Sequence, residues 1–160
     1  MIQLYTLNAS QYPLLSNTFY LDLYDKFTGQ DATNRVMVSL TSQFTGKTKT
    51  LLASTGYTNK ERYISCGIVT VRNPDLEDFS QNKVLVGTTD FPLGFYDITL
   101  YENKDNTNLD PSEALATIYN GLMNLSVNTI FSGGSEPPVK YTEYTTNDAD
   151  TESIYLTNPL

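Results

Sequence analysis

The sequence predicts an all-β domain: an antiparallel β-sandwich of about seven to nine strands, Ig-like or jelly-roll-like, with at most one short helix. Tyrosine and threonine are abundant, and these residue types favour strands. Segments in which apolar and polar residues alternate recur along the chain, separated by Asn, Gly, Ser and Pro at short intervals. Strands do not alternate with helical patterns, which disfavours an α/β fold.

Three strands are predicted in the first part of the chain. Residues 2–7 alternate, and residues 8–13 follow as a turn-rich patch. Residues 19–25 alternate between apolar residues and Tyr or Asp, which indicates a half-buried strand. Residues 28–31 interrupt the pattern with Thr-Gly-Gln-Asp, and residues 35–41 resume it with three inward-facing apolar positions.

The middle of the chain is less regular. Residues 45–56 are expected to be a flexible stretch, in which Leu51-Leu52 is either a short strand or a pinned loop. Residues 60–71 form a long strand candidate in which Gly67 would mark a β-bulge. Pro74-Asp75 is a start signal for one helical turn over residues 76–79.

The last strands of the body enclose the only helix signal. Residues 83–87 predict a short strand, and residues 94–102 show the cleanest alternation in the chain. The helix signal begins at Asp110, with Pro and Glu in favourable positions, but residues 118–121 interrupt it after one or two turns. Residues 122–130 are then predicted to be a strand.

The expected domain organisation is one body with a C-terminal arm. Residues 1–132 form the sandwich, and Gly-Gly-Ser-Glu-Pro-Pro at 133–138 resembles a linker. Residues 139–160 predict a β-hairpin or arm that packs on the same domain or on a neighbouring copy. The first residues lack the charge and apolar pattern of a signal peptide, and no apolar run is long enough for a membrane helix.

Composition excludes several kinds of chemistry. The chain has no histidine, which removes Ser-His-Asp and Cys-His catalysis and most zinc sites. A single cysteine, Cys66, cannot form an internal disulfide and is expected to be a small buried residue, as in a reducing cytosol. The net charge of −8 and pI near 4.3 disfavour binding to nucleic acid.

Carboxylates are the remaining candidates for catalysis or metal binding. Pairs for glycoside hydrolysis would come from the acidic residues of strand-like segments, namely Asp22, Asp97, Glu102 and Glu143. Residues 103–110 are rich in oxygen ligands but lack the spacing of an EF-hand, and residues 148–152 are an acidic turn. Outward-facing strand residues and loop caps are the better explanation of these acids. The sequence therefore predicts a non-enzyme with no catalytic residue, no metal and no cofactor.

The order of segments resembles a class of small virion proteins of tailed bacteriophages, including marine and crAss-like phages. The motifs that carry this resemblance are Phe-Tyr-Leu-Asp-Leu-Tyr-Asp at 19–25, Lys-Glu-Arg-Tyr at 60–63, Gly-Phe-Tyr-Asp-Ile-Thr-Leu-Tyr-Glu at 94–102, Asn-Leu-Asp-Pro at 108–111, Gly121, and Ile-Tyr-Leu at 154–156. They span most of the chain, and the resemblance supplies no catalytic residue. It implies a capsid auxiliary or decoration protein that binds the capsid exterior, or a tail, baseplate or head-fibre adaptor.

The expected partners are the major capsid protein or other virion proteins, or further copies in a homo-oligomer, in a virion assembled in the host cytoplasm. Nucleic acid and membranes are not expected partners. An alternative of another class is a carbohydrate-binding module or small hydrolase. Chain ends often bridge neighbouring copies, and tyrosine is enriched at interfaces. The interface candidates are therefore in the first strand and the tail: Leu4, Tyr5, Tyr141, Tyr144, Tyr155 and Leu156.

Overall fold

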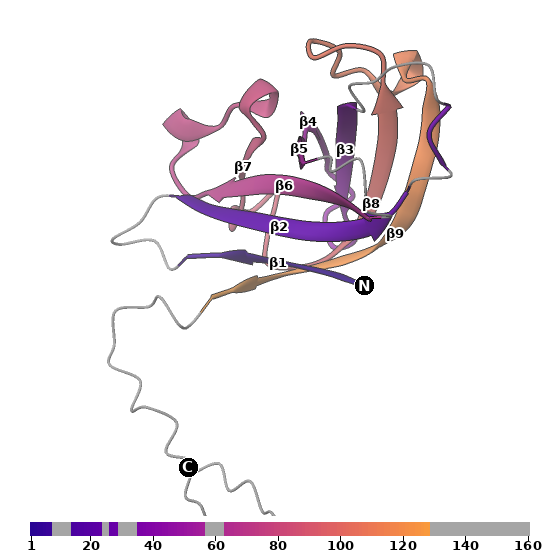
Figure 1. The fold of residues 1–160 in the computed structure, drawn as a ribbon. Helices are drawn as coiled ribbons and strands as arrows, with labels where there is room; N and C mark the ends of the chain where they lie inside the picture. Colours follow the sequence, from indigo (N-terminus) through magenta and orange to yellow (C-terminus); the bar gives the residue numbers. More distant parts are fainter. Residues whose placement is uncertain (8–13, 24–25, 29–34, 57–62, 129–160) are drawn as a thin grey trace, which may run out of the picture.

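The computed structural model describes residues 1–7, 14–23, 26–28, 35–56 and 63–128. Within these residues two β-sheets pack face to face, which confirms the predicted all-β sandwich (Figure 1). The described strands are β1 (Ile2–Thr6), β2 (Leu14–Asp22), β3 (Arg35–Ser42), β4 (Thr48–Leu52), β5 (Ser54–Gly56), β6 (Tyr63–Val71), β7 (Lys83–Leu85), β8 (Gly94–Asn103) and β9 (Ala116–Val127).

Both sheets are mixed, so the prediction of purely antiparallel pairing was wrong at two places. The larger sheet has the order β1-β9-β8-β3-β4, and β1 pairs with β9 in parallel. In the smaller sheet β2 and β5 flank β6, while β7 pairs with the other half of β6 in parallel. A parallel neighbour needs a crossover connection, and residues 72–82 provide it between β6 and β7.

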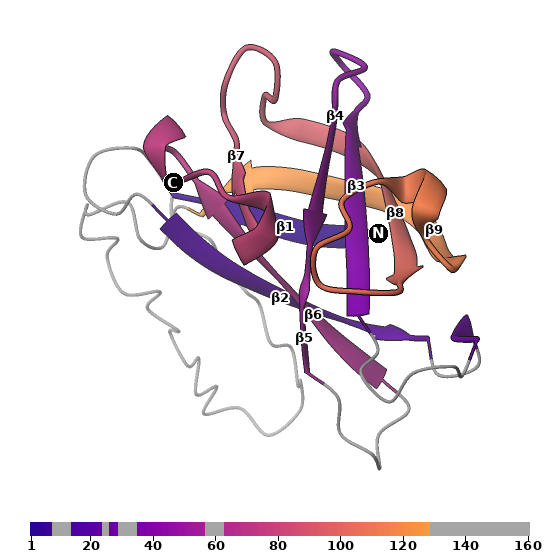
Figure 2. The ribbon, with the colours of Figure 1, turned by 90° about the horizontal axis from the view of Figure 1, so that it is seen from above.

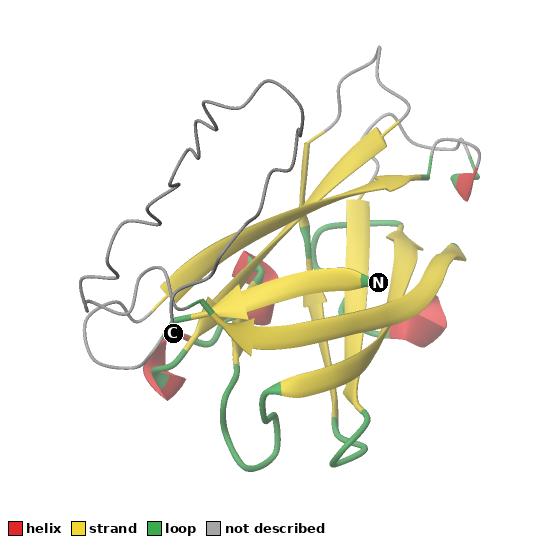
Figure 3. Cartoon of the chain, turned by 90° about the horizontal axis from the view of Figure 1, so that it is seen from below, coloured by secondary structure: helices red, strands yellow, loops and turns green. Residues whose placement is uncertain are grey.

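The larger sheet is strongly curved. Figures 1 and 2 show β9 leaving the side of β8 and bending round to lie along β1. The pairing of β8 with β9 shifts register between Leu100 and Tyr101, where Ile118 is an additional residue in β9. Such a bulge increases local twist and bends the strand. Figure 3 shows the resulting two crossing layers, with short helical turns beside the strands.

The stretch predicted to be flexible is ordered, and the predicted bulge is absent. Residues 45–56 contain β4 and β5, and β3 and β4 form a hairpin whose turn places Gly46 at φ +67°. Gly67 pairs with Thr18 without a register shift. A Cβ on Gly67 would lie 2.3 Å from Ser54 Oγ, so this glycine permits the close approach of β5 rather than a bulge.

Helical structure in the described residues is limited to single 3₁₀ turns. In place of one turn over residues 76–79 the structure has two, η2 (Pro74–Leu76) and η3 (Phe79–Gln81), which include the first and last residues of that range. The helix signal at Asp110 gives one turn, η4 (Pro111–Glu113), in agreement with the expected short helix. Residues 118–121 do not interrupt a helix, because they belong to β9, which begins at Ala116.

The core lies between the two sheets and follows the predicted alternation. In β8, Tyr96, Ile98 and Leu100 are fully buried, whereas Phe95 and Asp97 are exposed. Some strands depart from this pattern: in β3 residues on both faces are buried, and in β6 Cys66, Gly67 and Ile68 are buried in succession. The side chains that form the core are mostly aliphatic: they include Ile2, Leu4, Phe19, Val36, Val38, Leu40, Leu51, Ile64, Ile68, Val84, Phe91, Ile98, Met123 and Leu125.

Buried polar side chains join the two sheets along the edge formed by β1 and β2. Tyr5 N donates a hydrogen bond of 2.7 Å to Asn17 Oδ1, and Asn17 Nδ2 donates to Tyr5 O at 3.0 Å. Thr70 Oγ1 donates to the same Tyr5 carbonyl at 2.7 Å. Arg72 Nε continues this row with a bond of 3.1 Å to Leu7 O. The Asn17 amide thus replaces a neighbouring strand at the outer edge of β1.

A charged pair joins the sheets at the opposite edge. Lys49 Nζ of β4 lies 2.6 Å from Glu77 Oε1 and donates to Leu85 O of β7 at 2.9 Å. The same Glu77 oxygen accepts a bond of 2.8 Å from Leu85 N. The Lys49 ammonium also lies 4.9 Å from the centre of the Phe91 ring. Side chains therefore connect the sheets at both lateral edges.

Candidate functional site

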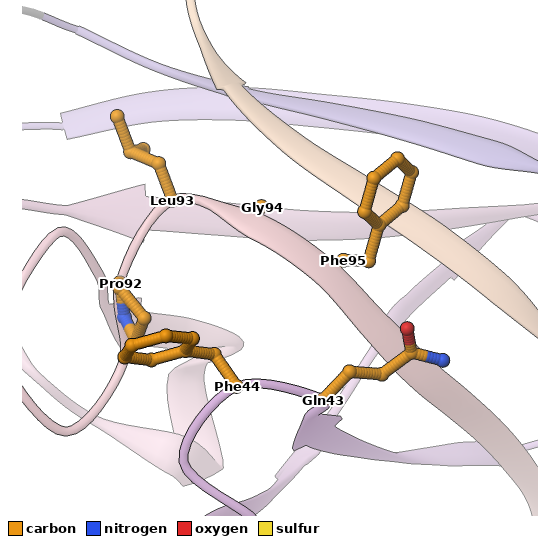
Figure 4. Close-up of a pocket in the computed structure, with 6 residues that line it drawn as sticks. All are labelled: Gln43, Phe44, Pro92, Leu93, Gly94 and Phe95. Atoms are coloured by element: carbon orange, nitrogen blue, oxygen red, sulfur yellow. The ribbon is translucent and has the colours of Figure 1, made fainter.

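A shallow pocket of about 460 Å³ lies at one end of the sandwich, where β8 begins and the β3–β4 hairpin turns (Figure 4). We call it the apical pocket. It is lined by residues from two loops and the start of β8: Gln43, Phe44, Pro92, Leu93, Gly94 and Phe95. Its lining is almost entirely apolar, and Gln43 is its one side chain with polar atoms.

Three large apolar side chains at the pocket face solvent. The exposed fractions are 87% for Phe44, 54% for Phe95 and 41% for Leu93. In Figure 4 the Phe44 ring lies against Pro92, while Leu93 and Phe95 project on either side of Gly94. Scattered apolar residues are normal on protein surfaces, but a group gathered around one pocket is typical of a binding surface.

Buried aromatic residues hold the pocket from below. Phe91 and Tyr96 are buried, and their rings lie 4.9 Å apart at an interplanar angle of 42°. The Tyr96 hydroxyl donates a hydrogen bond to the Pro92 carbonyl. Burial also raises the pKa of Tyr96 to about 12, so this hydroxyl keeps its proton at neutral pH. Phe95 precedes the buried Tyr96 in β8, so strand alternation turns the Phe95 side chain outward.

Hydrogen bonds tie the two pocket loops together. Thr45 Oγ1 of the hairpin turn donates to Asp90 O at 2.7 Å, and Gln43 N donates to Phe95 O at 3.1 Å. Phe91 O accepts bonds from Gly87 N and Thr88 N, which closes the turn before the pocket. The pocket is therefore largely formed before any partner arrives, which lowers the entropic cost of binding.

Gly94 forms the open floor of the pocket. Its φ of +130° lies in a region that residues with a side chain rarely adopt. A Cβ at Gly94 would have no atom within 4 Å, so the space above its backbone is empty. This notch between Leu93 and Phe95 suits an inserted apolar or aromatic side chain.

The surroundings of Phe95 on the larger sheet are polar and carry little charge. Gln43 Nε2 donates to Asp97 Oδ1 at 2.9 Å beside the ring. On the other side Asn124, the cross-strand partner of Phe95, donates to Gln3 Oε1 at 3.1 Å. Asp97 and Asp90 are the exposed carboxylates nearest the pocket in sequence. The rim is therefore amide-rich with a weakly acidic character.

The structure places the predicted interface residues differently. Leu4 is 1% exposed and belongs to the core, so it offers no surface to a partner; in the alternation of β1 it shares the buried face with Ile2. Tyr5 is 41% exposed, on the outer face of β1. The other four candidates lie outside the described residues: Tyr141, Tyr144, Tyr155 and Leu156.

Two of the acids considered for glycoside hydrolysis, Asp97 and Glu102, lie too far apart to act as a pair. Asp22 lies in the smaller sheet, whereas Asp97 and Glu102 lie in β8 of the larger one. Five positions of extended strand separate the last two by about 17 Å, beyond the 5–9.5 Å that the reaction needs. Glu102 is also buried and accepts a bond of 2.8 Å from Thr28 N. Glu143 lies outside the described residues.

The acidic loop after β8 uses its oxygens to build turns. Asp105 Oδ1 accepts from Thr107 N, Thr107 Oγ1 and Asn108 N at 2.7–2.9 Å. These bonds hold the pKa of Asp105 below its usual value. Asp110 caps η4, and bonds from Ser112 likewise lower its pKa. Among the described residues, no three acidic, cysteine or histidine side chains gather as a metal site would require.

Cys66 is buried in the core, as the sequence predicts. Burial raises the pKa of its thiol to about 12, so the nucleophilic thiolate is not formed at neutral pH.

Sequence reasoning missed the apical pocket. Its one available signal was Phe44, an aromatic residue beside Thr-Gly in a polar turn, where a buried side chain is not expected. Leu93 and Phe95 look like ordinary alternating positions until the fold brings the hairpin turn beside them. Comparison with protein-family models, with curated proteins and with solved structures gives no match to this chain. Among the described residues no helix has the length and apolar character needed to cross a membrane.

Proposed function

We propose that this chain is a structural protein of a tailed-phage particle, a capsid auxiliary or decoration protein that docks on the capsid exterior and stabilises the particle. The single observation that carries the docking role is the apical pocket, where Phe44 exposes 87% of its surface above a preformed apolar hollow. The sequence motifs supply the virion context. Enzymatic activity is not part of this proposal.

The bridged edges favour docking by side chains over addition of a strand. Tyr5 at the edge of β1 already has both backbone groups bonded to side chains of the smaller sheet. Leu85 at the other edge has its backbone bonded to the Lys49–Glu77 pair. At these two positions the backbone groups that a pairing strand would need are already bonded, which favours the apical pocket as the contact surface.

The test is cosedimentation of the purified chain with expanded capsids, free capsid subunits and tail assemblies. A decoration protein binds the assembled capsid and has poor affinity for free subunits. Phe44→Ser is expected to weaken capsid binding about tenfold or more, as loss of a central aromatic contact does. The matched control is Tyr20→Ser, which removes an aromatic side chain 68% exposed on β2 of the other sheet.

Each outcome of that experiment distinguishes one role in the particle from the others. Binding to tail assemblies but not to capsids would replace the decoration role by that of a tail, baseplate or head-fibre adaptor. Binding to none of these would overturn the virion proposal. Equal losses for Phe44→Ser and Tyr20→Ser would show that the apical pocket is not the contact surface.

A second candidate function, binding of a neutral glycan, is favoured by the amide groups around Phe95. An exposed ring flanked by Gln43 and Asn124 provides a stacking surface and planar hydrogen-bonding groups. Micromolar binding on a glycan array, weakened by Asn124→Ala, would support this function. Turnover that is lost in Asp97→Asn would favour the small hydrolase.

A further inference from the structure

Two rows of side chains cross the outer face of the larger sheet beside the apical pocket. The strand register places Phe95 of β8 opposite Asn124 of β9, and Asn124 opposite Gln3 of β1. In the next row Tyr5 of β1 lies opposite Ser126 of β9. We call these five residues the amide face. Phe95 and Tyr5 are exposed, and the three polar residues are half-buried.

Hydrogen bonds fix the orientation of both amide groups of this face. Gln3 Nε2 donates to Ser126 Oγ at 2.9 Å and to Leu4 O at 3.2 Å, which uses both of its hydrogens. Gln3 Oε1 is therefore the atom that accepts from Asn124 Nδ2 at 3.1 Å. Among the described residues the Asn124 side chain makes no other hydrogen bond. It keeps one N–H donor and its carbonyl oxygen, held in one plane, for a ligand.

The amide face carries no charged side chain, although the net charge of the chain is −8. Asp97, the next outward residue of β8 after Phe95, is a carboxylate that already accepts a bond from Gln43. A face without charges has nothing to compensate the desolvation of a charged ligand group. The ligand that fits this face is therefore neutral.

The size of the amide face favours a small ligand over a protein surface. Phe95 and Tyr5 are two strands and two residues apart, which corresponds to roughly 12 Å. A stable protein interface buries about 800 Å² on each partner, several times the area that two such short rows present. Two aromatic side chains at this separation span more than one sugar ring, so they match a chain of sugars.

We propose that the amide face binds a neutral, linear oligosaccharide whose rings carry neighbouring hydroxyl groups. One sugar stacks its apolar C–H face on the Phe95 ring. The free N–H of Asn124 donates to one hydroxyl of that sugar, and the Asn124 carbonyl accepts from the neighbouring hydroxyl. Tyr5 stacks a later sugar of the same chain. The inference rests on the second candidate function, to which it gives a site and a ligand class, and it is independent of capsid docking through Phe44.

The test is titration of the ¹⁵N-labelled full chain with maltohexaose, laminarihexaose, cellohexaose and mannohexaose, each compared with its disaccharide. Backbone amide signals of residues 3–5, 94–96 and 123–126 are expected to shift with at least one hexasaccharide. An oligomannuronate of the same length is the charged comparison and should not bind.

Variants locate the two sugar contacts. Phe95→Ser and Asn124→Ala should each weaken hexasaccharide binding about tenfold or more. Tyr5→Ser should weaken binding of the hexasaccharide but not of the disaccharide, a dependence on chain length that a change in folding would not produce. The matched control is Asn120→Ala, which removes another exposed amide of β9, and circular dichroism checks that each variant is folded.

The opposite results are equally definite. Absence of shifts with every neutral hexasaccharide would overturn both this inference and the second candidate function. Shifts confined to other residues would leave glycan binding in place but overturn the amide face, and so would equal losses for Asn120→Ala and Asn124→Ala. Signals of the face that change when the protein alone is diluted would assign the face to a second copy. None of these measurements uses capsids, so the outcome of the capsid experiment is separate.

Discussion

At the β1–β2 edge the exposed backbone groups of the outer strand are bonded within the molecule, whereas at the apical pocket apolar side chains are left open to solvent. At the edge, Asn17 is 7% exposed and its amide bonds to both backbone groups of Tyr5. At the pocket, Phe44 is 87% exposed and rests on a loop that buried aromatics hold in place. The edge is closed by contacts within the molecule, whereas the pocket is ordered but uncovered. The contrast separates groups that stabilise the fold from groups free for a partner, and four measurements of unfolding free energy test it.

The largest difference in the free energy of unfolding is expected between variants of Phe91 and Phe44. These two residues are 47 positions apart in sequence but close in space. Phe91→Ala removes a ring that is 1% exposed and contacts Tyr96 and Lys49. It should lower the free energy of unfolding by about 3–5 kcal/mol. Phe44→Ala should change it by less than about 0.5 kcal/mol. Urea denaturation measures both changes. A large loss of stability for Phe44→Ala would mean that Phe44 stabilises the fold and is not free for a partner.

Asn17→Ala should lower the free energy of unfolding by about 2–4 kcal/mol. It leaves Tyr5 N–H without its partner in a closed edge, and each unsatisfied buried polar group costs about 1–3 kcal/mol. The matched control is Asn120→Ala, which removes an exposed amide that accepts a bond from Thr99. Urea denaturation should show a change below about 0.5 kcal/mol for the control. Similar losses for the two variants would mean that Asn17 does not close the edge.

Gly87→Ala tests the Arg72 end of the same edge. Gly87 has φ +73°, and a Cβ there would overlap Arg72 Nη1 at 1.4 Å. Arg72 must then move away from Leu7 O. The free energy of unfolding of the variant should therefore fall by about 1–3 kcal/mol. Gly46→Ala is the control, since Gly46 has φ +67° but no atom within 4 Å of its Cβ position. Thermal unfolding of both variants separates the contribution of Arg72 from that of backbone strain, which the two variants share. Equal losses of stability in Gly87→Ala and Gly46→Ala would mean that strain alone causes the effect.

Asp105→Ala should have the smallest effect on the free energy of unfolding, although Asp105 accepts three hydrogen bonds. Asp105 lies in a surface loop and is partly exposed, so solvent replaces much of what the bonds contribute. The folded pKa lies below the ordinary 3.8, so the charged form stabilises the fold above that pH. The difference between native protein and Asp105→Ala should therefore be constant at neutral pH and decline as pH falls through the folded pKa. A difference that grows on acidification would contradict the assignment.

Periodicity located most strands because alternation is a local property. Residues 94–102 and 35–41 have an apolar side chain at every second position, and β8 and β3 cover them. The same reasoning failed for residues 45–56. Thr48, Thr50 and Lys49 look like loop residues, and only pairing with β3 makes them a strand. It also failed at 118–121, where a helix start signal just upstream competed with the strand.

By itself the sequence determined the class of fold, the buried thiol of Cys66 and the single turn capped by Asp110, because each depends on residue type and near neighbours. Tertiary structure decided the parallel pairs, the bridges made by Asn17 and by Lys49 with Glu77, and the apical pocket. Each of these joins residues far apart in the chain: Phe44 and Leu93 come together only when the β3–β4 hairpin turns beside the start of β8. A docking surface of this kind arises from tertiary packing, so no local pattern in the sequence predicts it.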